Sequence, residues 1–462
     1  MTPLLIIRTV AIDSLTPYNQ SARIHNRAQH RKLEKILSRF GQVLPIIVDD
    51  KNVVIDGHAV LQGLKALGRT EIQVVVAASR DPVEIRALRL ALNRIPADAG
   101  WDREKLRTEF AQLIDLGTDM ELTGFDTVEI DMTLAIDEPA DDACETIPID
   151  DLTSKPIAAT VTGDIWRLGR HRIACGDARD KDLIARLTEG RMVAAVFVDP
   201  PYNVPIDGHV SGLGRTRHAE FAMASGEMTA EQFTAFLTTS FAAMVPSLAD
   251  GAIVFAAMDW RHMGEITKAA SNCEFELKNV CVWVKSNAGM GTFYRSQHEF
   301  IFVFKQGKGA HQNNFELGQH GRSRSNVWRY AGVNTFGKNR MDELTVHPTV
   351  KPLKMIADAL KDVTRRGELV IDSFLGSGST MLAAEETGRT CLGVEVDPGY
   401  VEVAIRRWQK FTGKTAVHLV TGELFDEYCE RVARERVSSC LLESNDTVPA
   451  PVPEAISGAD QS

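Results

Sequence analysis

The stretch Glu368–Asp397, ELVIDSFLGSGSTMLAAEETGRTCLGVEVD, reads as a strand, a glycine-containing turn, a helix and a second strand. Both strand candidates are nearly continuous apolar runs, which is typical of strands that are covered on both faces of a parallel sheet. Similar runs alternate with helical patterns from residue 161 to about 425, among them VAAVFVDP, AIVFAAMD, VCVWVK and EFIFVFK. This alternation predicts an α/β fold built on a mostly parallel sheet.

The turn after the first of these strands is a candidate cofactor site. Gly376 and Gly378 would let the backbone approach a ligand closely, at a helix terminus with free N–H groups. Glu395 ends the second strand, where an acid can accept hydrogen bonds from both hydroxyls of a ribose. Met381 stands where dinucleotide-binding turns have a third glycine, and Asp372 directly precedes the turn. A carboxylate there suits a cation, so S-adenosylmethionine is favoured over NAD.

A second motif, AVFVDPPYN at Ala195–Asn203, ends an apolar strand with Asp199. Pro200 and Pro201 fix the backbone and have no N–H, which leaves a stiff loop rich in acceptors, and Tyr202 adds a planar ring. Hydrogen bonds to such a loop would orient the exocyclic amine of a planar base and disperse its developing positive charge. In a duplex the base would first have to be extruded. A simple strand-ending turn is the alternative interpretation.

With the acidic-proline motif ahead of the cofactor turn, the chain resembles the β class of DNA amino-methyltransferases, in which the catalytic motif comes first. Three further stretches resemble motifs of that family: CGDA at Cys175–Ala178, SQHEFIFVFKQGK at 296–308 and HPTVKP at His347–Pro352. The resemblance covers about residues 161–425. It implies a Rossmann-like sheet that binds S-adenosylmethionine and methylates adenine N6 in double-stranded DNA, because the DPPY form is commoner among adenine enzymes. Cytosine N4 is the alternative target.

The resemblance also implies the roles of individual residues. Asp177 would contact the adenine of the cofactor, and His347 and Lys351 would flank its methionine moiety. The catalytic residues that it implies are Asp199, Pro200, Pro201 and Tyr202. The other cofactor-binding residues that it implies are Asp372, Phe374, Gly376, Gly378, Ser379, Thr380 and Glu395.

A basic segment within an acidic chain is the candidate DNA-recognition region. The formal net charge is −10, yet residues 278–351 contain eleven Lys or Arg and four Asp or Glu. Such a segment attracts a phosphate backbone, although a solvated face has the same composition. We place the target-recognition segment at about residues 285–340. Its candidate DNA-binding residues are Arg295, Arg322, Arg324 and Arg329, with Phe293, Tyr294 and Trp328 beside them.

The amino-terminal stretch VIDGHAVLQGLKALG, at residues 54–68, resembles the ParB-like nuclease domain. Asp56, Gly57 and His58 match its motif, but Val60 stands where that family has an arginine, which argues against nuclease activity. We expect a DNA-engaging or structural accessory role. A helix-capping turn is the plainer interpretation. A whole-chain alternative is a ParB-like DNA-binding or nuclease protein whose methyltransferase half is degenerate.

Composition and patterning set the expected domains and surroundings. Seven scattered cysteines without a CxxC pair argue against a disulfide framework and against a metal site. No apolar run reaches the roughly 20 residues that span a membrane, so we expect a cytoplasmic, nucleoid-associated protein that could form a homodimer. The expected divisions are a ParB-like α+β domain with a helical extension at 1–130, an acidic linker at 131–160, the methyltransferase domain at 161–425 and a largely disordered tail at 426–462.

Overall fold

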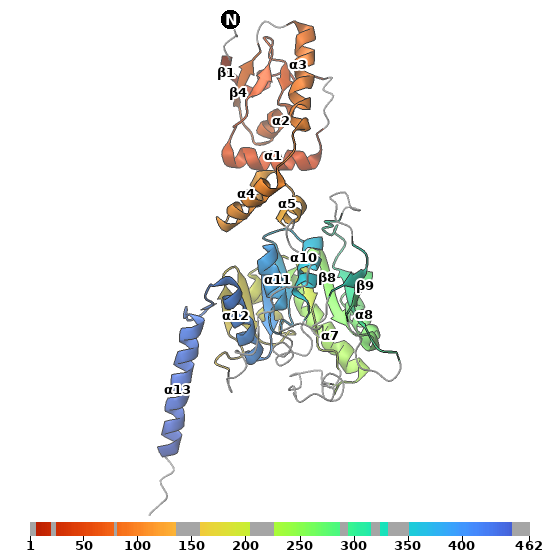
Figure 1. Ribbon diagram of the computed structural model, residues 1–462, viewed down its shortest axis with the longest axis vertical. Coiled ribbons are helices and arrows are strands. Elements are labelled where there is room, and N and C mark those ends of the chain that lie inside the picture. Colours follow the sequence, from red (N-terminus) through yellow and green to blue (C-terminus); the bar gives the residue numbers. More distant parts are fainter. Residues whose placement is uncertain are drawn as a thin grey trace, which may run out of the picture. The chain divides into compact units, whose positions relative to one another are not determined.

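The computed structural model describes residues 6–19, 25–77, 81–134, 158–203, 226–286, 294–315, 324–330 and 351–445. The chain divides into two compact units, Met1–Pro139 and Ala140–Ser462. Both are drawn in Figure 1, and each is considered by itself. No helix within the described ranges is long and apolar enough to cross a membrane.

The amino-terminal unit contains a four-stranded sheet covered by helices. Strands β2 and β4 are parallel, while β1 and β3 pair antiparallel at the two edges. Leu37, Leu61 and Leu64 pack from the helices into the core of this sheet. The strands, in sheet order, are β1 (Ile6–Ala11), β4 (Glu71–Val76), β2 (Ile46–Val48) and β3 (Val54–Asp56). The helices are α1 (Arg27–Phe40), α2 (His58–Ala66) and α3 (Pro82–Arg94).

A smaller helical group follows the sheet in the same unit. It comprises α4 (Arg103–Asp115), η3 (Met120–Thr123) and α5 (Thr127–Leu134). Lys32 and Lys35 of α1 reach toward it, with Lys32 Nζ 2.9 Å from Asp126 and Lys35 Nζ 2.8 Å from Asp119. This helical group therefore contacts helix α1 through ion pairs. Its small core consists of Phe110, Met120 and Ile130.

The second unit is built on a ten-stranded mixed sheet, which confirms the predicted α/β class. The five central strands β8, β7, β12, β13 and β6 are parallel, and antiparallel pairs extend the sheet toward both edges. The sheet order is β11 (Val327–Arg329), β9 (Glu276–Val284), β10 (His298–Lys305), β8 (Leu248–Met258), β7 (Val193–Val198), β12 (Leu369–Asp372), β13 (Thr390–Glu395), β6 (His171–Cys175), β5 (Ile165–Leu168) and β14 (Val417–His418).

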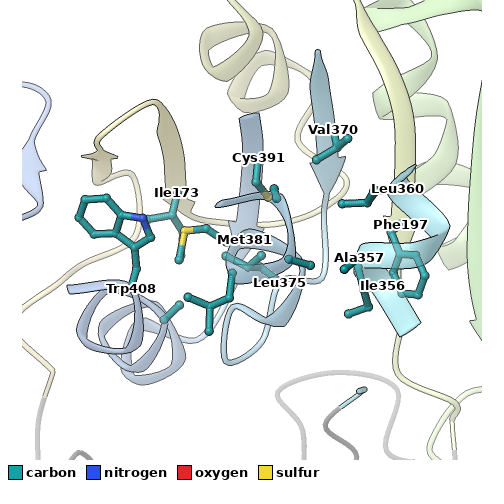
Figure 2. Packing of buried hydrophobic residues seen from close by; sticks show 14 of the residues in the cluster. Ile173, Phe197, Ile356, Ala357, Leu360, Val370, Leu375, Met381, Cys391 and Trp408 are labelled. Carbon is teal, nitrogen blue, oxygen red and sulfur yellow. The ribbon is translucent and has the colours of Figure 1, made fainter. Parts of the chain in front are cut away.

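Helices cover both faces of this sheet, as its apolar strands predict. One core combines Met381, Trp408 and Leu360 of the helices with Phe197 and Cys391 of the strands, and Figure 2 shows the side chains of this cluster. The second core gathers side chains of α6, α7 and α8 against the other strand residues. The helices of this unit are α6 (Lys181–Thr188), α7 (Ala230–Met244), α8 (Met263–Asn272), α10 (Leu353–Val363), α11 (Ser379–Thr387), α12 (Pro398–Thr412) and α13 (Phe425–Asn445).

The direction of the chain reverses between β7 and β12. The chain runs from β7 through α7 to β8 on one side, and from β12 through α11 to β13 on the other. These two strands are neighbours, with Ile371 paired to Val196. In open α/β sheets, ligands bind beyond the carboxyl ends of the strands at such a switch point. Two motifs far apart in sequence therefore end side by side at the place expected for a ligand.

The carboxyl-terminal segment differs from its prediction. We predicted a largely disordered tail from residue 426, but α13 is helical over Phe425–Asn445. Phe425 is fully buried against Trp166, and Tyr428 lies beside it with its hydroxyl 3.1 Å from Asp164. These aromatic contacts anchor the first turns of a polar helix, and the polar composition of the segment concealed them.

A buried histidine holds three elements of the sheet region together. The Nδ1 atom of His171 accepts a hydrogen bond from the Cys391 N–H at 2.9 Å, and its Nε2 lies 2.5 Å from Glu385. The same carboxylate accepts a hydrogen bond from the Trp408 indole at 3.1 Å. Burial lowers the pKa of His171, although Glu385 works in the opposite direction. The imidazole is therefore a neutral ring that donates from Nε2.

Replacing His171 with leucine is expected to destabilise the protein by about 2–4 kcal/mol, because a buried N–H and a buried carboxylate lose their partner. Urea unfolding followed by circular dichroism measures this free energy. His262→Leu is the matched control, since the His262 ring packs edge-on against Phe233, and its polar contact with Glu265 is long, at 3.4 Å. Equal losses in both variants would contradict the structural role of His171.

Candidate functional site

Four carboxylates gather at the carboxyl edge of the parallel strands. Asp177 follows β6, Glu395 ends β13, Asp372 ends β12 and Asp199 follows β7. The register brings these ends to one edge, because Glu395 pairs with Cys175 and the strands between run in parallel. Sequence reasoning singled out all four acids, and the structure brings them to neighbouring strand ends.

Asp372 is a buried acid, 3% exposed, at the start of the glycine turn. Its Oδ1 accepts a hydrogen bond from the Phe374 N–H at 3.0 Å, and Thr380 donates a second one. Burial raises the pKa of Asp372 to about 7, and the charges of Asp199 and Glu395 act in the same direction. No Lys or Arg of the described ranges forms an ion pair with it. A cation placed here would relieve this electrostatic cost.

Glu395 lies on the next strand and braces the same turn. Its Oε2 accepts the Gly376 N–H at 2.8 Å, and its Oε1 accepts the Asp397 N–H at 2.9 Å. Burial raises the pKa of Glu395 to about 7. Each oxygen has a further lone pair, so this carboxylate can also accept hydrogen bonds from a diol.

The glycines of the turn serve the backbone and the packing. Gly376 and Gly378 have φ of 53° and 89°, in the left-handed region that favours glycine. A Cβ on Gly378 would lie 3.0 Å from the Cβ of Ala404, so α11 and α12 could not approach as they do. Arg407 of α12 donates to the Ser377 carbonyl and hydroxyl at 2.7 and 2.8 Å. Arg407 was not predicted from the sequence, because a charged residue in an amphipathic helix is expected to face the solvent.

Asp177 is held by a neighbouring arginine. The Arg179 guanidinium donates three hydrogen bonds of 2.6–3.1 Å to the carboxylate of Asp177. These bonds lower the pKa of Asp177. The guanidinium also lies 5.5 Å above the ring of Phe236, whose centroid is 6.0 Å from that of Phe374. Arg179 thus links the carboxylate of Asp177 to an aromatic pair. Sequence reasoning missed both Arg179 and Phe236.

The loop after β7 is enclosed by charged side chains. Tyr202 Oη lies 3.0 Å from Asp199 Oδ1 and 3.0 Å from Glu299 Oε2. Lys351 Nζ lies 2.6 Å from Asp199 Oδ2 and 3.1 Å from Glu299. Lys285 donates to the other oxygen of Glu299. The acid and the ring of the acidic-proline motif are thus fixed by residues from three other segments.

Lys351 is the residue that the resemblance places, with His347, beside the methionine moiety of the cofactor. In the structure its ammonium contacts Asp199 and Tyr202 of the loop after β7. Glu299 belongs to a stretch that the sequence analysis quoted without assigning it a role. Although burial acts in the opposite direction, Lys351 and Lys285 lower the pKa of Glu299 to about 2.

The remaining predicted residues fall into three groups. Pro200, Ser379 and Thr380 are buried next to the two motifs, and Pro201 is half-buried. Arg295 and Arg329 are exposed. Three other predicted residues, Phe293, Arg322 and His347, lie outside the described residues.

The side chain of Arg324 is held by contacts within the fold. Its side chain is 15% exposed, its Nη1 lies 2.9 Å from Asp362, and its guanidinium lies 4.6 Å above the ring of Trp328. Trp328 itself is 5% exposed and belongs to the core of the sheet. Among the predicted DNA-binding residues that the structure describes, Arg295 and Arg329 are the exposed ones.

Comparisons with known proteins find similarity in two segments of the chain. The DNA methylase family matches residues 193–406, and the ParB-methyltransferase HTH domain matches residues 104–159. The type II methyltransferase M2.MboI of Moraxella bovis is 23% identical over 227 residues, which are 47% of this chain and 81% of that protein.

Two solved structures are similar to part of the chain. The M1.HpyAVI–SAM complex covers 51% of this chain and 98% of its own, with 21% identity and a TM-score of 0.36. PvuII DNA methyltransferase (cytosine-N4-specific) covers 61% of this chain and 95% of its own, with 13% identity and a TM-score of 0.40. The helical group at 103–134, which the sequence analysis describes only as an extension, overlaps the residues matched by the ParB-methyltransferase HTH domain.

Proposed function

We propose that this chain, which carries a DNA methylase domain at 193–406 and a ParB-methyltransferase HTH domain at 104–159, methylates adenine N6 in double-stranded DNA. It is a DNA methyltransferase of the N6-adenine/N4-cytosine family, and adenine is the target that we propose. The observation that carries the proposal is the adjacency of β7 and β12, which brings Asp199 and Asp372 to neighbouring strand ends at the switch point. A methyl donor and a methyl acceptor can meet there.

The residues around Asp372 fit S-adenosylmethionine. Asp372 is a buried carboxylate that gains from a cationic partner, Glu395 retains acceptor capacity for a ribose, and Asp177 follows the strand next to that of Glu395. The cofactor supplies a methyl group on a positively charged sulfur, which leaves as a neutral thioether. The chain's own contribution is to bind and orient: the glycine turn positions the backbone, and the acids neutralise the positive charge.

The loop Asp199–Tyr202 is proposed to receive the amine. The amine hydrogens would bond to the Asp199 carboxylate and to a proline carbonyl, and the Tyr202 ring would stack on the extruded base. As the new carbon–nitrogen bond forms, the nitrogen becomes positively charged, and the nearby carboxylate stabilises that charge. One proton then leaves the nitrogen, and Asp199 is its nearest acceptor. The aspartate that opens the motif is the feature that favours adenine over cytosine.

We assign DNA engagement to two parts of the chain. The HTH helices α4 and α5 lie in the amino-terminal unit, and the exposed Arg295 and Arg329 lie in the segment proposed for target recognition. Arginine and lysine on such surfaces bind phosphates and give a strong dependence on salt. The ParB-like sheet would then serve as an accessory to the methyltransferase unit.

Mass spectrometry of methylated DNA tests the proposal. Unmethylated duplex DNA is incubated with the full chain and isotopically labelled S-adenosylmethionine, then digested to nucleosides. We expect labelled N6-methyladenine, with single-stranded DNA as a parallel substrate. Labelled N4-methylcytosine would overturn the adenine assignment, and the absence of any labelled nucleoside would overturn the proposed function.

A further inference from the structure

At the loop Asp199–Tyr202, four charged side chains and one hydroxyl form a connected network. Its members are Asp199, Glu299, Lys285, Lys351 and Tyr202, and its formal charge is zero. They come from β10, from the residue that follows β9, from the position two residues before the amino end of α10, and from the loop after β7. Separate elements of the fold therefore converge on one carboxylate.

The ammonium of Lys351 is fully occupied by acceptors. Its Nζ lies 2.6 Å from Asp199 Oδ2, 3.1 Å from Glu299 Oε2 and 3.1 Å from Tyr202 Oη, so each of its three N–H groups has a partner. The side chain is 4% exposed, while that of Asp199 is 22% exposed. The lysine is enclosed, and the carboxylate still presents an open edge to a substrate.

Glu299 is the second carboxylate that binds Lys351. Its side chain is 12% exposed, and both of its oxygens are engaged, one by Lys285 and the other by Lys351 and Tyr202. Without Glu299, Lys351 would have only the catalytic loop to bind. A carboxylate that is paired on one side and open on the other is oriented before the substrate arrives.

We propose that Lys351 and Glu299 are positioning residues for methyl transfer, which hold the Asp199 carboxylate and the Tyr202 ring in the orientation that receives the target amine. This inference rests on the proposed function. Lys351 fixes one oxygen of Asp199, Tyr202 occupies the other, and the remaining lone pairs face the exposed side. The same contacts fix the phenol oxygen, so the ring presents a constant face for stacking. Neither Lys351 nor Glu299 needs to touch the base.

The electrostatic consequences of the two substitutions have opposite signs. The charged and titratable groups that act on Asp199 are Lys351, Glu299, Tyr202 and Asp372. Removing the ammonium of Lys351 raises the pKa of Asp199, because the carboxylate loses its counter-charge. Removing the charge of Glu299 lowers the pKa of Asp199, because a like charge is lost.

Single-turnover methylation of duplex DNA, measured from pH 5 to 9, tests the inference. For Lys351→Met and Glu299→Gln we expect rates reduced by about 50-fold or more, the scale of misplacing a reacting group by about 1 Å. The acidic limb of the rate profile should move to higher pH in Lys351→Met and to lower pH in Glu299→Gln. Calorimetry with S-adenosylmethionine should show unchanged affinity in both.

A second Lys–Glu pair near the opposite end of β10 provides the matched control. Lys305 Nζ lies 3.4 Å from Glu276, and Lys305→Met and Glu276→Gln should keep the rate and the profile of the wild type. Lys351→Arg, which retains the charge, should keep the acidic limb near its original position. If Lys351→Met does not fold, the other two variants test the inference. The acidic limb should move to lower pH in Glu299→Gln and stay near its original position in Lys351→Arg.

The outcomes separate this inference from the function beneath it. Opposite movements of the two limbs, with slower transfer and intact cofactor binding, support it. A wild type that methylates DNA, with variants whose rates are unchanged or whose limbs do not move, overturns it. A wild type that gives no labelled nucleoside overturns the proposed function and, with it, the positioning role.

Discussion

Replacing Asp199 with alanine is expected to abolish methyl transfer, with a loss of at least about 1,000-fold, while cofactor affinity stays within about twofold of the wild type. Asp199 lies at the end of β7 and Asp372 at the end of the neighbouring β12. The first acid faces the loop of the proposed acceptor, and the second lies at the glycine turn of the proposed donor site. The substitution therefore removes the amine receptor and leaves the cofactor's contacts in place.

The measurement combines single-turnover methylation with calorimetry of S-adenosylmethionine binding. Asp199→Asn should be nearly as inactive, because its amide would present either a donor or an uncharged oxygen to the amine. Asp180→Ala is a control for general destabilisation, since Asp180 caps α6 by accepting two N–H groups at 2.9 and 3.0 Å. It should lose about 1 kcal/mol of stability and keep its activity. Retained transfer by Asp199→Ala would refute the assigned role.

The strand ends that form this site could be predicted from the sequence. Asp199, Asp372 and Glu395 each terminate an apolar run, and the carboxyl ends of parallel strands share one edge of a sheet. The alternation of strands and helices also predicted that both faces are covered. These features depend on local pattern, and local pattern is what a single sequence displays.

The contacts that support the loop after β7 could not be predicted from the sequence, for a physical reason. Glu299 and Lys285 come together because β9 and β10 pair antiparallel, with Glu299 opposite Trp283. Lys351 reaches them from a segment more than fifty residues further along the chain. No periodicity marks such meetings, since they depend on the register of distant strands. Arg324 is a further example: the basic segment suggested a DNA contact, and nothing in the sequence indicated its ion pair with Asp362.

The affinity for S-adenosylmethionine is expected to fall as the pH decreases through about 7. Burial raises the pKa of Asp372 to about 7, so below this value the acid carries a proton in the free protein. A cationic ligand favours the ionised form, and binding must then displace that proton. For one such group the affinity should be about 30-fold weaker at pH 5.5 than well above pH 7, where Asp372 is ionised.

Asp372→Asn separates this acid from the rest of the site. We expect its affinity for S-adenosylmethionine to be reduced by about 100-fold at pH 8, because the amide keeps the shape and loses the charge, with most of the dependence on pH lost as well. Calorimetry over pH 5.5–8.5 measures both quantities. Asp250→Asn is the control: Asp250 lies near the amino-terminal end of β8, accepts the Gly309 N–H at 2.8 Å, and should leave both unchanged.

The residual dependence on pH identifies the second acid. Burial also raises the pKa of Glu395 to about 7, but its proposed partners are hydroxyls, which can bond to either form of the acid. The carboxylate accepts both hydroxyls, whereas the protonated acid accepts less well, so only a shallow slope should remain in Asp372→Asn. A full slope in that variant would transfer the cationic contact to Glu395. An affinity that stays flat with pH in the wild type would mean that neither acid faces the positive charge.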